Sequence, residues 1–223
     1  MSIEVWCCWP TVNMERSREM IKVWHERGYK VSVLINPPHE DTELAEAERV
    51  IVQNEWKGFP VAANVLCWET PGDIVVVVGD DIYPDKDHTP QEIAGDFQRH
   101  FPDFFGVMQP IGDEFGWTHK CAVSPWIGKM FIEKSYNGCG PFWEEYFHYF
   151  CDQELQEYAT KLGVFYQRKD LTQYHDHWQR KEGGERPGYL LPAKKRWHKD
   201  KKIFDGRMAK GFPDGINKTR RYS

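Results

Sequence analysis

The sequence predicts an α/β fold in which a mainly parallel sheet is flanked by helices and followed by a mixed C-terminal half. Two observations support this prediction. Residues 3–35 show a strand pattern, a helix pattern and a second strand pattern, which is typical of a right-handed βαβ unit. Residues 74–78 form an unbroken aliphatic run, which suits a strand buried on both faces in the middle of a parallel sheet.

The elements of the first βαβ unit follow one another closely. Residues 3–9 are largely apolar and end at Pro10, as expected for a strand. Residues 13–28 place apolar side chains at helical spacing and end in a glycine, which predicts a helix and its stop. Residues 31–35 predict the second strand.

The later elements are predicted from the same patterns. Residues 41–54 predict a helix with a polar face, and residues 62–66 predict the start of another helix. Short strands are expected at residues 104–110 and 164–166. Residues 141–162 predict a long amphipathic helix, because a proline stands near its first turn and a glycine follows its end.

We expect one domain over residues 1–192 and a basic tail over residues 193–223. The chain of 223 residues is long enough for one substantial core. Its net charge is −5, whereas residues 194–223 carry eleven Lys and Arg against three Asp, a net charge of +8. Two interpretations of this basic segment stay open: a disordered, solvated terminus, or an electrostatic contact to a polyanion such as nucleic acid.

Cysteine usage and the apolar runs bear on the cellular compartment. The six cysteines form no CxxC pair, so reduced thiols are expected rather than a zinc site or a disulfide scaffold. The longest aliphatic run is far shorter than the roughly 20 residues of a membrane span. No signal-peptide pattern is visible near the first residue. These features predict a cytoplasmic location.

A pair of acidic residues directly follows the aliphatic run. Asp80 and Asp81 come first, and Asp85 and Asp87 lie close behind. Ligands of open α/β sheets bind outside the carboxyl ends of the strands. Carboxylates gathered at such a place repel each other unless a cation neutralises them, and a divalent ion with oxygen ligands fits. The alternative interpretation is a solvated acidic turn.

The motifs around this acidic pair resemble those of the GT-A glycosyltransferases, especially their large inverting single-domain family. Upstream, that family shows a glycine, a helix rich in small residues with an asparagine, and an Ala-Asp or Gly-Asp pair. The matching residues here are Gly58, Ala62-Ala63-Asn64 and Gly72-Asp73. Downstream, the family shows an Asp-x-Glu-Leu stretch on a helix that precedes a glycine, and a later histidine. The matching residues here are Asp152-Gln153-Glu154-Leu155, Gly163, and His175 or His177.

The resemblance implies a role for each matching residue. Asp152 would be the catalytic base, and Asp81 would bind the metal together with His175 or His177. Asp80 would contact the ribose or a metal-bound water. The other nucleotide-contacting residues that it implies are Pro10, Thr11, Asn13, Asn36 and Asn64. The acceptor-binding candidates are Trp117, His119 and Trp126.

One position departs from the pattern of this family. Where the family often has a third consecutive acid, this sequence has Gly79, and Asp85 is a candidate replacement. The departure affects how the metal would be coordinated.

The implied activity is transfer of a sugar from a nucleotide sugar to an acceptor hydroxyl, with inversion at the anomeric carbon. The resemblance implies a Mn or Mg ion as the cofactor and favours a UDP-sugar as the donor. Residues 1–110 would then form the nucleotide-sugar half of the domain, and residues 111–192 the acceptor half.

The basic segment guides the prediction of the acceptor. Its lysines and arginines are interleaved with Trp197, Phe204 and Tyr222, a composition that suits a nucleic-acid backbone and exposed bases. We therefore predict a DNA-modifying glycosyltransferase, of the kind phages use on hydroxymethylated pyrimidines. A base inside a duplex would have to be flipped out first. The alternatives are transfer to a surface glycan, a nucleotidyltransferase, and a non-catalytic binding module on the same fold.

Overall fold

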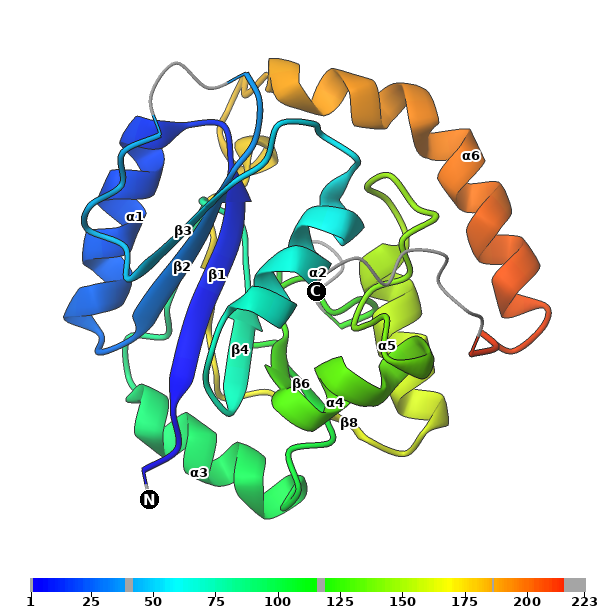
Figure 1. Cartoon of the computed structure of the whole chain (residues 1–223), viewed down its shortest axis with the longest axis horizontal. Coiled ribbons are helices and arrows are strands. Elements are labelled where there is room, and N and C mark those ends of the chain that lie inside the picture. The colour runs from blue at the N-terminus through cyan, green and yellow to red at the C-terminus, as the bar shows by residue number, and fades with distance from the viewer. Residues whose placement is uncertain (1, 39–41, 116–118, 186, 215–223) are drawn as a thin grey trace.

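The computed structural model describes residues 2–38, 42–115, 119–185 and 187–214, which form an α/β fold (Figure 1). Within these ranges the main sheet has seven strands. In spatial order they are β3 (Arg49–Val52), β2 (Lys30–Ile35), β1 (Val5–Thr11), β4 (Ile74–Val77), β7 (Trp126–Gly128), β6 (Val107–Pro110) and β8 (Phe165–Arg168).

The first four strands of the sheet, β3, β2, β1 and β4, are parallel. Strand β7 then runs antiparallel to both of its neighbours, β4 and β6, and β8 is parallel to β6. A separate two-stranded antiparallel sheet joins β5 (Ile82–Tyr83) to β9 (Tyr174–His175). The predicted α/β class, with a mainly parallel sheet and a mixed C-terminal half, is confirmed.

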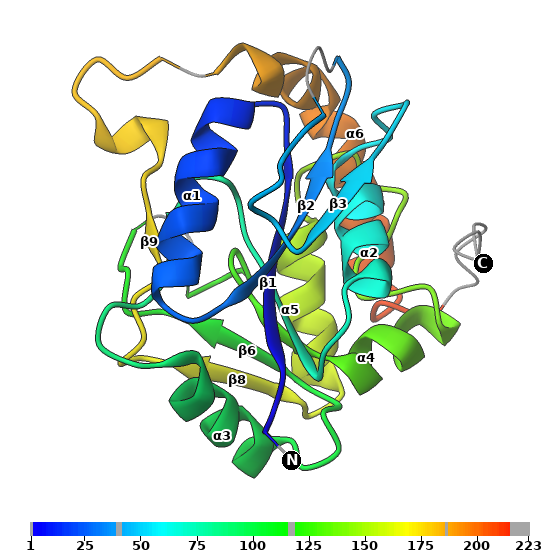
Figure 2. The ribbon, with the colours of Figure 1, turned by 60° about the vertical axis from the view of Figure 1, so that its left-hand side comes forward.

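Helices cover both faces of the main sheet (Figure 2). Helices α1 (Met14–Glu26) and α3 (Pro90–His100) bury their apolar sides in the core on one face. Helices α2 (Phe59–Glu69), α4 (Lys129–Lys134) and α5 (Cys151–Lys161) pack into the core on the other face. Helix α6 (Leu191–Met208) packs against α5. Two layers of helices therefore leave the strand ends as the open edge of the sheet.

Helix α1 shows how local sequence sets these elements. The side chain of Asn13 accepts a hydrogen bond from the backbone N–H of Arg16, which caps the first turn. Met20, Ile21 and Trp24 lie on one side of the helix and are buried against the sheet. The helix therefore begins and packs where the sequence pattern predicts.

The predicted helix at residues 41–54 is wrong. The described part of this range ends in β3, whose residues Val50, Ile51 and Val52 pair with β2 in a parallel register. Three β-branched residues in a row favour a strand, and the free edge of β2 supplies its hydrogen-bond partners. Tertiary pairing therefore prevails over a weak helical pattern.

The predicted helix at residues 141–162 begins only at Cys151. Phe150, which precedes it, has a φ of 70°, in the left-handed region that interrupts a helix. The backbone N–H groups of Phe147, His148 and Tyr149 donate instead to the carboxylate of Asp200, at 3.0–3.1 Å. A buried acid on α6 therefore fixes this segment in an irregular conformation.

Helix α6 was not predicted, because two of its three buried residues are charged and the apolar spacing along it is weak. Its buried residues are Ala193, Asp200 and Arg207, spaced seven residues apart and thus on one face. Arg207 donates through two nitrogens to the carboxylate of Glu154 on α5, at 2.7–2.9 Å. The basic segment therefore begins as a helix anchored to the domain, and over its described residues it is not a disordered tail.

All six cysteines are buried free thiols. In the described part of the chain, no helix has both the length and the apolar character that crossing a membrane requires.

Candidate functional site

A cleft runs along the carboxyl ends of β1, β2 and β4, and it consists of two adjoining cavities. The smaller, of about 260 Å³, contains the predicted acids and histidines and is called the acidic cavity. The larger, of about 520 Å³, has mostly apolar walls and is called the apolar cavity. Both cavities are lined by Pro10, Phe59, Asp80, His148 and Leu190. The cleft thus lies where ligands of open α/β sheets bind.

Asp80 occupies the boundary between the two cavities. Its Oδ2 accepts a hydrogen bond from the hydroxyl of Thr11 at 2.7 Å, and its carbonyl oxygen accepts one from Nε of Arg16 at 2.8 Å. Burial raises the pKa of Asp80; the Thr11 hydroxyl opposes this shift, and the neighbouring charge of Asp81 adds to it. The residue is therefore fixed in place, and its negative charge is poorly compensated by the protein.

Asp81 faces a histidine that comes from a distant part of the chain. Oδ2 of Asp81 lies 3.2 Å from Nε2 of His175. Burial opposes ionisation of Asp81, but the contacts with His175, Arg16 and His177 outweigh it and lower the pKa of this carboxyl. Asp81 is therefore held as a carboxylate.

The pairing of β5 with β9 brings His175 to this position. Ile82 is paired with His175 in that two-stranded sheet, and the N–H of Asp176 donates to the carbonyl oxygen of Asp81 at 2.8 Å. The N–H of His175 donates to Oδ2 of Asp113 at 2.9 Å. Backbone bonds on both sides of the histidine therefore fix where its ring lies.

His177 lines the same cavity but holds a different role. Its ring centroid lies 4.9 Å from that of His175. Its Nδ1 accepts a hydrogen bond from the N–H of Gln179 at 3.2 Å, which caps a short 3₁₀ turn. Of the two histidines, His175 therefore has the ring nitrogen that is directed at Asp81.

The donor set at Asp81 fits a divalent cation held by few protein ligands. Among the described residues, no group of three or more His, Cys, Asp or Glu side chains is gathered as a complete metal site. In octahedral coordination at about 2.1 Å, neighbouring ligand atoms lie about 3.0 Å apart, and the Asp81–His175 separation is 3.2 Å. One carboxylate and one imidazole would leave the other coordination positions to phosphate oxygens and water, as Mg²⁺ and Mn²⁺ sites on nucleotides require.

Asp152 lines the acidic cavity from the first turn of α5, far along the chain from the acidic pair. Its Oδ1 accepts a hydrogen bond from the N–H of Gln153 at 3.0 Å. Burial raises the pKa of Asp152, while the bond from Gln153 and the Cys121 thiol oppose that shift. Burial also raises the pKa of Cys121, so the thiol keeps its proton and can donate it in a hydrogen bond to Asp152. A carboxylate with raised proton affinity suits a general base.

Besides Asp80, three of the predicted nucleotide contacts line the apolar cavity: Pro10, Thr11 and Asn36. Asn36 is 4% exposed, and its Oδ1 is buried without a hydrogen-bond partner among the described residues. Buried amide oxygens are nearly always paired in proteins. The oxygen is therefore available to a ligand that brings its own N–H group.

Four of the predicted contacts lie elsewhere. Asn64 is fully buried, and its amide bonds Phe142 through both of its polar atoms, so it supports that segment and does not line the cleft. Trp126 is 1% exposed in β7 and donates to Gln173, so its expected role in acceptor binding is wrong. Asn13 caps α1 outside both cavities. His119 is exposed and lines neither cavity, and Trp117 lies outside the described residues.

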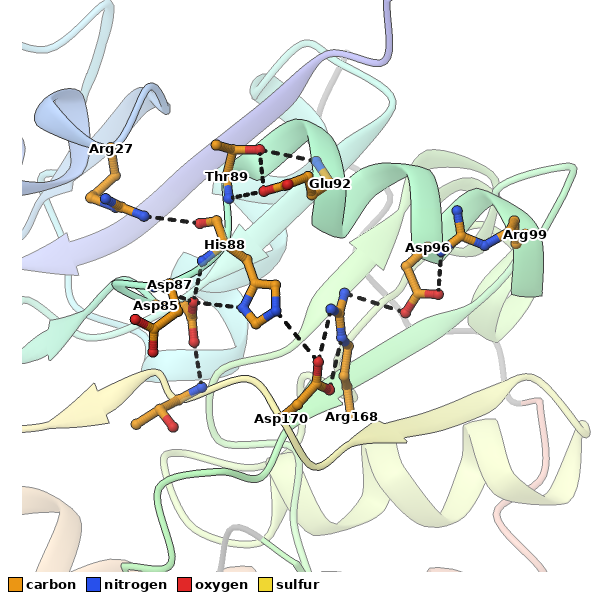
Figure 3. A network of polar contacts seen from close by, with 11 residues as sticks. Arg27, Asp85, Asp87, His88, Thr89, Glu92, Asp96, Arg99, Arg168 and Asp170 are labelled. Carbon is orange, nitrogen blue, oxygen red and sulfur yellow. Dashed lines mark hydrogen bonds and ion pairs between the residues drawn. The ribbon is translucent and has the colours of Figure 1, made fainter.

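Asp85 does not replace the acid that is missing at position 79. Its carboxylate accepts hydrogen bonds from the N–H groups of Asp87, His88 and Thr172, and from the His88 ring, at 2.7–2.9 Å (Figure 3). His88 in turn lies 3.5 Å from Asp170, which is paired with Arg168. Asp85 therefore belongs to a network that ties the acidic turn to the chain after β8.

Sequence reasoning missed several residues of the cleft. His148 lines both cavities. Arg16 lines neither, but it supports the cleft from behind by bonding the carbonyl oxygen of Asp80 and the carboxylate of Asp176, the latter at 3.3 Å. Trp56 and Phe147 form apolar walls. The position of Arg16 on the first turn of a helix after β1 could have indicated that it lies near the strand ends. Residues 147–148 are positioned by Asp200, and their sequence alone does not indicate a place in the cleft.

Comparison with protein-family models gives no match, and comparison with curated protein sequences gives none either. Solved structures do share the architecture. A mannosyltransferase from Pyrobaculum calidifontis in complex with GDP-Man and Mn²⁺ aligns over 76% of this chain with a TM-score of 0.57 and 13% identity. S. aureus TarS 1–349 in complex with UDP-GlcNAc aligns over 82% with a TM-score of 0.60 and 14% identity. The fold is that of the GT-A glycosyltransferases.

The chain is shorter than the structures whose fold it shares. It spans 56% of the mannosyltransferase and 60% of the TarS fragment. At 13–14% identity, the likeness establishes the GT-A fold and not the activity.

Proposed function

We propose that the protein is a glycosyltransferase that takes its sugar from a nucleotide sugar, holding the donor diphosphate through a divalent cation. The observation that carries the proposal is the meeting of Asp81, His175 and Asp152 in one cavity. Two candidate ligands of a cation, Asp81 and His175, and a candidate base, Asp152, thus lie next to the larger apolar cavity. The GT-A neighbours support it, because one was solved with GDP-Man and Mn²⁺ and another with UDP-GlcNAc.

The apolar cavity is assigned to the nucleoside of the donor. The side chains of Trp56, Phe59 and Phe147 provide flat apolar walls against which a base can stack. The buried Oδ1 of Asn36 can accept from the N3–H of uracil, while the amide nitrogen of the same residue can donate to a uracil carbonyl. This complementarity favours a UDP-sugar.

The reaction would be an inverting displacement at the anomeric carbon. Asp152 accepts the proton of the acceptor hydroxyl as that oxygen attacks, and its raised pKa favours this transfer. The cation bound by Asp81 and His175 would neutralise the negative charge that develops on the diphosphate. Thr11 keeps Asp80 in place beside this site.

The acceptor is proposed to be a hydroxymethylated pyrimidine in DNA. Support comes from α6, which carries Lys194, Lys195, Lys199 and Lys202 on its exposed side, with no ion-pair partner among the described residues. The buried positions of α6 lie on the opposite side of this helix. Its outer surface therefore carries a lysine row that spans about 12 Å of a helix about 27 Å long, a charge pattern suited to a phosphate backbone.

The position of α6 connects this surface with the cleft. Pro192 and Ala193, in its first turn, line the apolar cavity together with Leu190. A duplex lying along α6 would therefore pass beside the entrance of the cleft. An anionic membrane is less favoured, because a helix that inserts into a membrane needs an apolar face, and the apolar side chains Ile203 and Phe204 of α6 pack against the protein core.

A thermal-shift panel of nucleotide sugars, each with and without Mn²⁺, tests the donor assignment. A ligand that binds only the folded state raises its stability, so one donor should raise Tm in the presence of the metal. Asp81→Asn should abolish the metal-dependent part of the shift, whereas the control Asp87→Asn, on the exposed part of the same turn, should keep it. A panel without any shift would overturn the proposal.

Binding to duplex DNA at several salt concentrations tests the acceptor class. Replacing Lys194, Lys195, Lys199 and Lys202 with Gln should make the DNA affinity depend less on salt. In a plot of the logarithm of the binding constant against the logarithm of the salt concentration, the slope should become shallower by about 0.9 for each phosphate contact that is lost. The matched control neutralises four exposed lysines on other faces: Lys22, Lys57, Lys86 and Lys169. No DNA binding by the wild-type protein, or binding only to anionic vesicles, would exclude DNA and leave a surface glycan as the favoured acceptor. Equal DNA binding by both variants would show that the lysines of α6 are not the binding site.

A further inference from the structure

His148 stands at the junction of the two cavities. Of the residues that line both, Pro10, Phe59 and Leu190 have no polar side-chain atom, and Asp80 carries a negative charge. His148 is therefore the shared residue whose side chain can donate a hydrogen bond to an anion. A ligand with one end in each cavity must pass it.

The backbone of His148 is fixed from two directions. Its N–H donates to Oδ2 of Asp200 at 3.0 Å, and its carbonyl oxygen accepts from Sγ of Cys151 at 3.2 Å. Asp200 is 1% exposed and also receives the N–H groups of Phe147 and Tyr149. The imidazole stands edge-on to the ring of Phe59, with centroids 6.1 Å apart. The side chain thus leaves a rigid segment toward the cleft.

The chemistry of the donor indicates which atoms would meet this imidazole. With the nucleoside in the apolar cavity and the sugar in the acidic cavity, the group that crosses the junction is the diphosphate. A cation held by Asp81 and His175 would contact only some of the diphosphate oxygens, and the remaining ones are strong hydrogen-bond acceptors. Either neutral or protonated imidazole can offer an N–H group to one of them.

We propose that His148 is a further catalytic residue, which donates a hydrogen bond from its ring to the departing diphosphate. The inference rests on the proposed function. The bond from the anomeric carbon to the diphosphate oxygen breaks, and its electron pair stays on that oxygen. The acceptor oxygen forms the new bond to the anomeric carbon and gives its proton to Asp152. His148 keeps its proton, and its hydrogen bond strengthens as charge grows on the diphosphate.

A purely structural role for His148 predicts different behaviour, so a set of substitutions can separate the two. His148→Phe keeps a flat ring against Phe59 and removes the donor, whereas His148→Gln keeps a donor and removes the ring. If the ring donates to the diphosphate, the Phe variant should lose about 10²- to 10³-fold in kcat, as when one oxyanion donor is removed. The Gln variant should recover part of this loss.

A binding measurement gives a readout that does not depend on turnover. Titration with UDP and with uridine, both with Mn²⁺ present, compares a ligand that has the diphosphate with one that lacks it. The Phe variant should bind UDP more weakly than the wild-type protein does, while uridine affinity stays unchanged. Equal loss for both ligands would indicate a structural role and overturn the inference.

The outcomes also separate this inference from the proposed function. If the wild-type protein binds no nucleotide in the presence of Mn²⁺ and turns over no nucleotide sugar, the proposed function fails, and the role of His148 fails with it. If the wild-type protein is active and His148→Phe retains its kcat and its UDP affinity, the role of His148 alone is wrong.

Discussion

Nε2 of His175 lies 3.2 Å from Oδ2 of Asp81, and this contact joins the turn after β4 to strand β9 in the wall of the acidic cavity. The two residues lie far apart in the sequence, and the pairing of β5 with β9 brings them together. The contact makes the proposed metal site directly testable.

Substituting each histidine should give unequal effects on metal-dependent binding. His175→Ala should weaken Mn²⁺-dependent UDP binding by about tenfold or more, since it removes the nitrogen that is directed at Asp81. His177→Ala is the matched control and should have a smaller effect, because its Nδ1 is already engaged by Gln179. Calorimetric titration with and without EDTA provides the measurement. A larger loss from His177→Ala would reverse the assignment of the two residues.

Gly79→Ala should damage the proposed site without damaging the fold. A Cβ at position 79 would lie 2.5 Å from Oδ1 of Asp81, so the flexible carboxylate must turn away while the backbone stays. We expect Tm to change little and the Mn²⁺-dependent UDP affinity to fall.

Gly95→Ala is the control for that substitution. Its added Cβ would meet nothing closer than 3.9 Å, and alanine is favoured over glycine inside α3 by about 1 kcal/mol. This variant should be as stable as the wild-type protein or more so, with unchanged nucleotide binding. If Gly79→Ala kept full metal-dependent affinity, the carboxylate of Asp81 would not be needed in its present orientation.

Asp152→Asn should reduce turnover and raise stability at neutral pH. Loss of a general base costs about 10²- to 10⁴-fold in rate. Because burial raises the pKa of Asp152 in the folded state, its stabilising contribution is present below the ordinary value of 3.8 and is lost as the pH rises through the folded-state pKa. At pH 7 the neutral Asn avoids the cost of a buried charge. Chemical denaturation at pH 7 should therefore show a more stable variant, with the difference shrinking in acid.

The same raised pKa sets the acid limb of the rate profile. The base must be deprotonated, so kcat should rise with pH through a value above the ordinary aspartate range. Cys121→Ala removes a thiol that lowers the pKa of Asp152, so it should move this limb to higher pH. A profile that stays in place would show that Cys121 does not act on the base.

Arg207→Met should destabilise the protein strongly. Glu154 is 0% exposed, and without Arg207 its remaining partners are the hydroxyls of Tyr136 and Tyr146. Leaving this charge buried should lower the free energy of unfolding by about 3–5 kcal/mol. Lys201→Gln breaks the exposed ion pair with Asp205 on the same helix, and this control should change the free energy of unfolding by no more than about 0.5 kcal/mol. Urea denaturation compares them. Adding Glu154→Gln to Arg207→Met should recover part of the loss, because the amide carries no charge.

Local pattern was sufficient to predict the first βαβ unit and the central strand, whereas it gave a helix where β3 lies and did not reveal α3. The βαβ unit and the strand before Asp80 follow from apolar periodicity, because each element buries side chains that its own sequence displays. The resemblance to GT-A enzymes added Asp152 and the two histidines, which the structure brings to one cavity with Asp81.

The second half depends on partners that are distant in sequence. Trp126 was expected to bind the acceptor, but β4 and β6 pair with it on either side, and its side chain lies in the core. Residues 147–149 take their conformation from Asp200. The buried side chains of Asp200 and Arg207 also position α6, and a hydrophobic pattern does not predict that charged residues are buried. His148 was missed for the same reason. Polar tertiary contacts of this kind cannot be read from periodicity.

Helix α6 combines an inward polar side with an outward lysine row, and this has a practical consequence for dissecting the protein. Deleting the C-terminal residues from 194 onward would remove the acceptor of three backbone N–H groups beside the cleft and the partner of Glu154. Such a shortened protein would be expected to lose the proposed turnover through damage to the cleft, so its loss of any DNA binding would not identify a role of the lysines. Only point changes on the solvent side of α6 can reveal whether nucleic-acid recognition and sugar transfer are separable properties.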